Sequence, residues 1–332
     1  MRSSTPTVSV VVPTRNRRTL LAQTLRSVLA QVGVDLEVIV VDEASTDDTI
    51  QWLTALADER VVVVRHASPQ GVASARNDGA AHARADWLAF VDDDDLWAPD
   101  KLSEQLRAAK ACRADWVYTG AVNIAERCRI VYGRPPLTAE ELMKALPHYN
   151  AVPGGGSNVV VRRKMWEEAG PFDTRLLNTE DWEMWIRLAK LGPPACVPRP
   201  LVAYRVHGAN SSLNVAEIVR GTRLIERVHN TTADWGNLHR YMAESYLRKG
   251  QKGAAVRQFV AAAMRGHLRE TASDIRIILR RKMRRVTDMP EGSAATQGGA
   301  ADPWLTEAAT WLRHFQEDED TIPIREAVEW PK

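Results

Sequence analysis

Apolar residues along the first third of the chain form two alternating patterns. The runs at 8–12, 37–41, 61–64 and 87–91 are short and almost wholly apolar, which is typical of parallel strands covered on both faces. Between them, apolar residues recur at helical spacing, as in 20–29. This alternation predicts an α/β fold with a doubly wound, mostly parallel, Rossmann-like sheet.

The strand–helix alternation weakens after about residue 123 and is replaced by helical patterns. We expect one α/β domain over 1–212. A helical region should follow over 213–286, made of a tetratricopeptide-like helix pair and a basic amphipathic helix. Residues 287–332 should hold a Gly/Ala/Ser-rich linker and a C-terminal amphipathic helix, which should pack against another element.

Composition narrows the class of protein. The 332 residues are 45% hydrophobic and 26% charged with a net charge of +2, which is ordinary for a globular protein and argues against a nucleic-acid partner. The three cysteines are far apart and favour a reducing compartment. Neither a signal peptide nor a run of about 18 apolar residues is evident. We expect a cytoplasmic protein, at most peripheral at the inner face of a membrane.

Polar residues follow the predicted strands at the point where each strand ends. They are Pro13, Thr14 and Arg15 after the first strand, Asp42 after the second, and 92–95 after the fourth. Ligands of doubly wound sheets bind beyond the carboxyl ends of the strands. The pattern therefore predicts a binding site at this edge, although a merely solvated edge would also be polar.

The acidic run 92–95 contains two carboxylates at DxD spacing, Asp92 and Asp94. Alternate residues at a strand end can hold one hard divalent cation, which would offset the repulsion among the four acids. An acidic turn before the helix at 100–111 is the alternative, because acids stabilise a helix N-terminus. We prefer the metal for Asp92 and Asp94, and the helix interaction for Asp95 and Asp100.

Three further features are candidates for chemistry. Glu180 and Asp181 open a helix beside Trp182, which suggests a base next to an aromatic platform for a sugar ring, or simply acids at a helix N-terminus. Arg76 lies among small residues in a predicted helix, where it is either functional or merely exposed. His207 is a possible ligand or an ordinary hydrogen-bonding residue.

Five motifs in order carry a family resemblance: VSVVVPTRN, VIVVDEASTDDT, GVASARNDGA with WLAFVDDDD, GPFDTRLLNTEDWEMW, and VAYRVHGANSS. Together they resemble the family 2 glycosyltransferases, inverting enzymes with a GT-A fold, over about residues 7–212. The resemblance implies a catalytic domain that moves a sugar from a nucleotide-diphosphate donor, which we expect to be a UDP-sugar, to a hydroxyl of a saccharide or lipid-linked acceptor. The expected process is cell-surface polysaccharide or glycolipid synthesis.

On the donor side, the resemblance places several residues at the nucleotide-sugar: Pro13, Thr14, Arg15, Asp42, Arg76, Asp92 and Asp93. Asp42 would hydrogen-bond the base. Asp94, with His207, would bind Mn2+ or Mg2+. Glu43 and Ala44 depart from the usual V-D-D-G-S motif, which leaves the nucleotide less defined.

On the acceptor side, the resemblance makes Asp181 the catalytic base, with Glu180 and Trp182 in the acceptor site. The glycine-rich loop 152–158 either lines that site or simply joins two strands.

Two other functions remain open. One is a degenerate GT-A protein that binds nucleotide or saccharide without turnover. The other is a metal-dependent nucleotidyltransferase, which is disfavoured because no glycine follows the first strand in PTRNRR. The basic amphipathic segment 273–286 either contacts an anionic membrane or packs on its helical neighbours.

Overall fold

The computed structural model describes residues 5–207, 214–284 and 302–316. The chain divides into two compact units. The first, here called the sheet unit, comprises 1–146, 150–207 and 304–332, and the second, the helical unit, comprises 147–149 and 208–303. The division after 207 lies close to the predicted boundary at 212. Residues 304–316, which the sequence pattern assigns to a separate C-terminal segment, belong to the sheet unit.

Nine strands of the described chain form one sheet in the order β3-β2-β1-β4-β8-β6-β9-β5, with β7 paired to β6. The strands are β1 (Val8–Thr14), β2 (Leu36–Asp42), β3 (Val61–Arg65), β4 (Trp87–Phe90), β5 (Leu96–Trp97), β6 (Trp116–Ile124), β7 (Ile130–Arg134), β8 (Val160–Arg162) and β9 (Ala195–Arg205). The first four strands pair in parallel, whereas β8, β7 and β5 run antiparallel to their neighbours.

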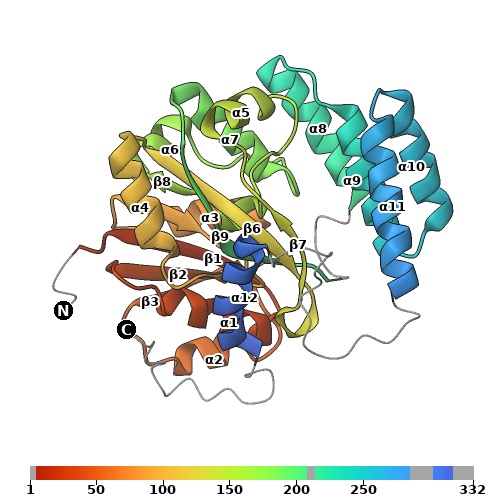
Figure 1. Cartoon of the computed structure of the whole chain (residues 1–332). Helices are drawn as coiled ribbons and strands as arrows, with labels where there is room; N and C mark the ends of the chain where they lie inside the picture. Colours follow the sequence, from red (N-terminus) through yellow and green to blue (C-terminus); the bar gives the residue numbers. More distant parts are fainter. Residues whose placement is uncertain (1–4, 208–213, 285–301, 317–332) are drawn as a thin grey trace. The chain divides into compact units, whose positions relative to one another are not determined.

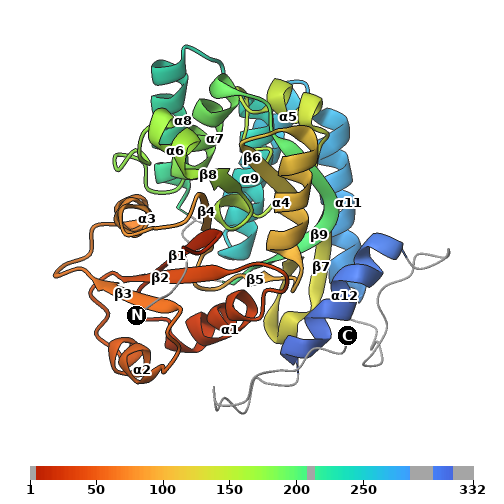
Figure 2. The ribbon, with the colours of Figure 1, turned by 90° about the vertical axis from the view of Figure 1, so that its left-hand side faces the viewer.

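Helices cover both faces of this sheet, as the α/β prediction requires. Figure 2 shows α1 and α2 on one face of the β1–β3 part and α3 on the other. Every residue of β1 and β2 is buried, which is why these strands are apolar without alternation. The helices of the sheet unit are α1 (Arg18–Leu29), α2 (Thr49–Ala55), α3 (Val72–Ala81), α4 (Lys101–Cys112), α5 (Ala139–Ala145), α6 (Arg163–Ala169), α7 (Glu180–Leu191) and α12 (Pro303–Gln316). The predicted doubly wound fold is confirmed.

The C-terminal helix α12 packs into the core of the sheet unit. It lies beside β7 in both views (Figures 1 and 2). Trp311 and Phe315 are buried in the main apolar core, and the Trp311 indole donates to the Pro200 carbonyl at 3.0 Å. The apolar stripe read from the sequence is thus the face that this helix buries.

The helical unit contains four helices in its described part: α8 (Val215–His229), α9 (Trp235–Arg248), α10 (Lys252–Met264) and α11 (Leu268–Arg284). The side chains of Asn214 and Asp234 accept hydrogen bonds from backbone N–H groups in the first turns of α8 and α9, which stabilises both helix starts. The predicted helix pair corresponds to α9 and α10. Residues 285–286 of the basic segment and 287–301 of the linker lie outside the described residues.

Candidate active site

The carboxyl ends of β1, β2 and β4 lie at one edge of the sheet, because β1 pairs in parallel with both neighbours. Pro13 and Thr14 end β1, Asp42 ends β2, and the acidic run follows β4. The Thr14 hydroxyl donates to Asp93 Oδ2 at 2.8 Å. Residues from strands far apart in sequence therefore meet at the edge that the strand pattern predicts.

Two basic side chains face the middle of the aspartate run. One guanidinium nitrogen of Arg17 lies 2.9 Å from both Asp93 Oδ1 and Asp94 Oδ2, and His207 Nε2 lies 2.8 Å from Asp94 Oδ2. Burial, together with the charge of Asp94, raises the pKa of Asp93 to about 6 although Arg17 opposes the shift. The two residues proposed from the resemblance as metal ligands, Asp94 and His207, are thus in direct contact.

Asp95 corrects one expectation, because it does not serve the helix that follows. Its side chain is fully buried, accepting from the Ser157 hydroxyl at 2.5 Å and from the Arg205 backbone N–H at 2.9 Å. The Arg205 side chain in turn donates to the Asp94 carbonyl at 3.0 Å. Asp95 therefore fixes the backbone around the metal-ligand candidate. Asp100 does stand at the N-terminus of α4, as expected, although its side chain pairs with Arg199 at 2.6 Å and makes no capping hydrogen bond.

Arg76 joins the acidic run to the acids of α7. One guanidinium nitrogen donates to Asp92 Oδ1 at 2.5 Å and another to Glu180 Oε1 at 2.7 Å, while the group lies 5.5 Å from the Phe172 ring centroid. Burial raises the pKa of Glu180, with Arg76 opposing, and Glu180 Oε2 accepts no hydrogen bond from the described residues. Arg76 is 2% exposed, so the reading of it as a surface arginine is wrong.

Asp181, the predicted base, is held at both oxygens. Oδ1 accepts from the Trp182 backbone N–H at 2.7 Å, and Oδ2 accepts from the Asn150 side-chain amide at 3.0 Å. Burial raises the pKa of Asp181, while Arg76 and these hydrogen bonds act in the opposite direction. A carboxylate with a raised pKa and a fixed orientation is suited to accept a proton.

The glycine-rich loop 152–158 runs against these charged groups. A Cβ at Gly156 would lie 2.3 Å from an Arg76 guanidinium nitrogen, and a Cβ at Gly155 would lie 3.0 Å from Asp181 Oδ2. Gly155 also has a φ of +56°, which favours glycine. The loop is therefore glycine-rich because it must approach the site closely, so it is more than a connection between strands.

The structure corrects the expectation for the aromatic residues of α7. Trp182 is 4% exposed and its indole donates to the Leu146 carbonyl at 2.7 Å; Trp185 is fully buried. Both rings are used by the core, so neither offers a free face to a sugar.

Asp42 and Glu43, at the end of β2, have different surroundings. The Asp42 carboxylate is buried, accepts from the Ser45 backbone N–H, and lies 3.5 Å from the Arg65 guanidinium. Glu43 contacts the His66 ring and accepts from the Gly71 backbone N–H at 2.5 Å. The longer acid at 43 therefore holds the loop that leads into α3, the helix that carries Arg76.

Sequence reasoning missed two residues of this site. Among the described residues, Arg15 is exposed and has no polar partner, whereas Arg17 makes the contact with the aspartates. Arg17 immediately precedes α1, so its position between a strand end and a helix start was an available signal. Asn150 had none, because it is a single polar residue in a loop.

Within the described part of the chain, no group of three or more His, Cys, Asp or Glu side chains is arranged to hold a metal. Asp94 and His207 supply one oxygen and one nitrogen that already converge. These two side chains could serve as protein ligands of a divalent cation. The mixed donor set suits Mn2+ at least as well as Mg2+.

Comparison with known proteins gives consistent matches. The model of the family described as "Glycosyl transferase family 2" matches residues 9–170. The putative teichuronic acid biosynthesis glycosyltransferase TuaG of Bacillus subtilis (strain 168) is 31% identical over 242 residues, covering 69% of this chain and 92% of that protein. The Escherichia coli UDP-Glc:alpha-D-GlcNAc-diphosphoundecaprenol beta-1,3-glucosyltransferase WfaP is 25% identical, covering 67% of this chain and 86% of its own.

Solved structures show the same fold. S. aureus TarS 1-349 in complex with UDP-GlcNAc has a TM-score of 0.57 at 17% identity, covering 90% of this chain and 98% of that chain. The longer S. aureus TarS chain has a TM-score of 0.54, and the match covers 43% of it.

Proposed function

Because the chain belongs to glycosyl transferase family 2, we propose that this glycosyltransferase moves a sugar, with inversion, from a UDP-sugar to a hydroxyl of a lipid-linked saccharide in cell-surface polysaccharide or glycolipid synthesis. The observation that carries the proposal is Arg76, which joins the carboxylate of Asp92 to that of Glu180. One buried cation thus couples the acids of the donor edge to the helix that carries the base.

The donor class is supported by the relatives, and the charged residues at the carboxyl ends of the strands support a site for it there. WfaP is named for UDP-glucose, and the TarS complex contains UDP-GlcNAc. In our proposal the nucleotide base lies toward Asp42 and Arg65, and the diphosphate lies toward Asp94. Six carboxylates (Asp92, Asp93, Asp94, Asp95, Glu180 and Asp181) gather with Arg17, Arg76 and Arg205, so acids outnumber arginines where an anionic donor must bind.

This charge balance favours a divalent cation with the donor. Asp94 and His207 would hold Mn2+ or Mg2+, which when bound supplies charge stabilisation for the departing diphosphate. Asp95 and Arg205 would keep the backbone of Asp94 in place through their hydrogen bonds.

The residues near α7 would perform the proton transfer. The acceptor oxygen forms a bond to the anomeric carbon while the bond from that carbon to the diphosphate oxygen breaks, and the electron pair leaves with the nucleoside diphosphate. Asp181 takes the proton of the acceptor hydroxyl. General-base help of this kind contributes roughly 100- to 10,000-fold to the rate. Asn150 acts as a positioning residue because it fixes the Asp181 oxygen at 3.0 Å.

The acceptor class is supported by the relatives, since WfaP is named for a diphosphoundecaprenol-linked substrate. No helix of the described residues is long and apolar enough to cross a bilayer. We place the protein on the inner face of a membrane, with contact through 273–286 and the exposed side of α10. Val256, Val260 and Met264 of α10 are 60%, 54% and 81% exposed.

Charge agrees with this membrane contact. Residues 249–269 contain five Lys or Arg and no Asp or Glu, and basic residues near an anionic surface contribute about 1 kcal/mol each. Sedimentation with phosphatidylglycerol vesicles should therefore be weakened by Val260→Asp but not by Val32→Asp, an exposed apolar position of the sheet unit. Equal binding by both variants would exclude α10 as the contact.

A donor panel tests the proposal. Purified protein with Mn2+ should hydrolyse UDP-sugars in preference to GDP- and dTDP-sugars, and chelation or Asp94→Ala should abolish the reaction. If nucleotide-sugars bind without turnover, the chain is a degenerate binding protein. Release of pyrophosphate from a nucleoside triphosphate and a sugar phosphate would instead identify a nucleotidyltransferase.

A further inference from the structure

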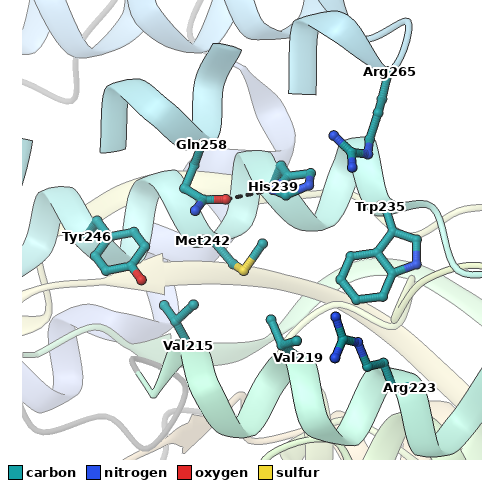
Figure 3. A pocket seen from close by; sticks show the side chains of 9 residues that line it. All are labelled: Val215, Val219, Arg223, Trp235, His239, Met242, Tyr246, Gln258 and Arg265. Carbon is teal, nitrogen blue, oxygen red and sulfur yellow. Dashed lines mark hydrogen bonds between the residues drawn. The ribbon is translucent and has the colours of Figure 1, made fainter. Parts of the chain in front are cut away.

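The helical unit contains a cavity that the proposed reaction does not use. It has a volume of about 550 Å³ and is lined by one face of α8, one face of α9 and residues from the C-terminal half of α10 (Figure 3). This volume lies within the range of small-molecule sites, roughly 300–1,000 Å³. All of the residues that line the cavity belong to the helical unit.

One end of the cavity is apolar. Val215 and Val219 of α8 face Met242 and Tyr246 of α9 in Figure 3. Each pair is spaced one turn apart, which is the spacing by which packed helices normally bury their contact faces. Here only Met242 is buried, and the other three remain partly exposed. The apolar surface is therefore left open to a ligand.

The other end is cationic. Arg223 from α8 and Arg265 from the end of α10 extend toward Trp235 from opposite sides (Figure 3), and the Arg223 guanidinium lies 6.0 Å from the Trp235 ring centroid. Neither arginine has a carboxylate partner among the described residues, and no acidic side chain lines the cavity. Arg265 also donates to the Ala261 carbonyl at 3.2 Å. The nearby Glu226 carboxylate already accepts from the Trp235 indole and the Ala233 N–H. Two arginines without a carboxylate partner, on either side of Trp235, form a suitable site for an anion.

The wall between the two ends is nearly neutral. His239 Nδ1 lies 2.6 Å from Gln258 Oε1; since an amide oxygen only accepts, this nitrogen donates. These two side chains are the neutral hydrogen-bonding groups beside the aromatic residues. A saccharide would need more such groups around its hydroxyls, and half of this lining is apolar instead.

We propose that the cavity binds an isoprenoid phosphate, with the phosphate or diphosphate between Arg223 and Arg265 and the first isoprene units against Val215, Val219 and Met242. The chemistry of an anionic amphiphile is read from the cavity itself. The choice of a polyprenyl chain rests on the proposed lipid-linked acceptor. Such a site would hold the lipid part of the acceptor on the protein and raise its effective concentration near the enzyme.

Calorimetry with three soluble probes tests this, using the full chain in EDTA so that metal-dependent donor binding does not contribute. The probes are farnesyl diphosphate below its micelle concentration, farnesol, and inorganic pyrophosphate. We expect farnesyl diphosphate to bind at least tenfold more tightly than either fragment, because only it satisfies both ends. Arg223→Gln and Arg265→Gln should each weaken it about tenfold, the scale of a lost charge-assisted hydrogen bond.

Arg227→Gln is the matched control, since Arg227 is exposed on α8 but does not line the cavity. Circular dichroism on each variant verifies folding. Val219→Asp tests the apolar end and should also weaken farnesyl diphosphate.

Three binding results would overturn the proposal: pyrophosphate or farnesol binding as tightly as farnesyl diphosphate, or an acidic oligosaccharide such as a hyaluronan tetramer binding more tightly. Equal effects of Arg223→Gln and Arg227→Gln on farnesyl diphosphate affinity would also overturn it. Hydrolysis of UDP-sugar by the wild-type protein is measured separately. Hydrolysis without farnesyl diphosphate binding would reject the cavity proposal and leave the proposed function intact.

Discussion

The arginines of the two units differ in burial and in pairing with carboxylates. In the sheet unit, Arg76 is 2% exposed and contacts two carboxylates. In the helical unit, Arg223 and Arg265 are exposed and have no carboxylate partner among the described residues. A buried, paired cation has one position and can align catalytic groups, whereas an exposed, unpaired cation is available to a ligand. We infer that the sheet unit binds the donor and carries the chemistry, and that the helical unit binds the lipid part of the acceptor.

The largest effect should come from removing the buried cation. Arg76→Gln leaves the buried Glu180 and the partly exposed Asp92 without their shared partner, so the free energy of unfolding should fall by about 3–5 kcal/mol and transfer should be lost. Denaturant unfolding measures the first effect and donor turnover the second. Arg18→Gln is the control, because its pair with Asp48 is exposed on both sides and should change stability by about 0–1 kcal/mol. Similar losses of stability and turnover in both variants would contradict the role of Arg76 as the cation that joins the two acidic groups.

Alanine substitutions at one glycine of each unit should have opposite effects on stability. Gly156→Ala would place a Cβ 2.3 Å from the Arg76 guanidinium, so unfolding free energy should fall by about 1–3 kcal/mol, with loss of activity. Gly253→Ala in α10 meets nothing within 4 Å, and should raise stability by about 0.5–1 kcal/mol because alanine favours a helix. Thermal unfolding of the two variants should therefore shift in opposite directions; a shift in the same direction would contradict the packing described for loop 152–158.

A smaller effect concerns the pH dependence. Asp181 must be deprotonated to act as a base, and burial raises its pKa, so the rate should fall on acidification at a higher pH than for an exposed aspartate. Asn150 donates to the charged carboxylate and opposes that shift. Asn150→Ala should thus move the acid limb of the kcat profile to still higher pH. The alkaline limb serves as the internal control, and an unchanged acid limb would remove Asn150 from the positioning role.

The sequence predicted the parts of the fold that depend on local pattern. Apolar runs predicted β1–β4. The polar residues after these runs predicted the edge of the sheet where the site lies, because parallel strands align their carboxyl ends. Asp92, Asp94 and Asp181 could be selected by motif. Their roles as metal ligand or base remain predictions, which the donor panel and the variants test.

The predictions that were wrong or incomplete concern residues whose contacts lie far away in the sequence. Asp95 is chemically identical to its three neighbours, yet its carboxylate accepts from Ser157 and Arg205, whereas those of Asp93 and Asp94 contact Arg17. Trp182 has the composition of a sugar platform but is used by the core. Arg17 and Arg15 share the signal of lying between a strand end and a helix start, and only the contacts with Asp93 and Asp94 distinguish Arg17. Such assignments require the three-dimensional partners, which lie far away in sequence.

Donor binding and turnover, measured side by side in Asp181→Asn and Asp94→Asn, test whether Asp94 serves donor binding and Asp181 serves as the base. If the donor edge binds and α7 carries the base, Asp181→Asn should bind the UDP-sugar like the wild type while kcat for transfer falls about 100- to 10,000-fold. Asp94→Asn should instead lose affinity for the donor. Transfer by Asp181→Asn at the wild-type rate, or an equal loss of donor affinity in both variants, would contradict the account.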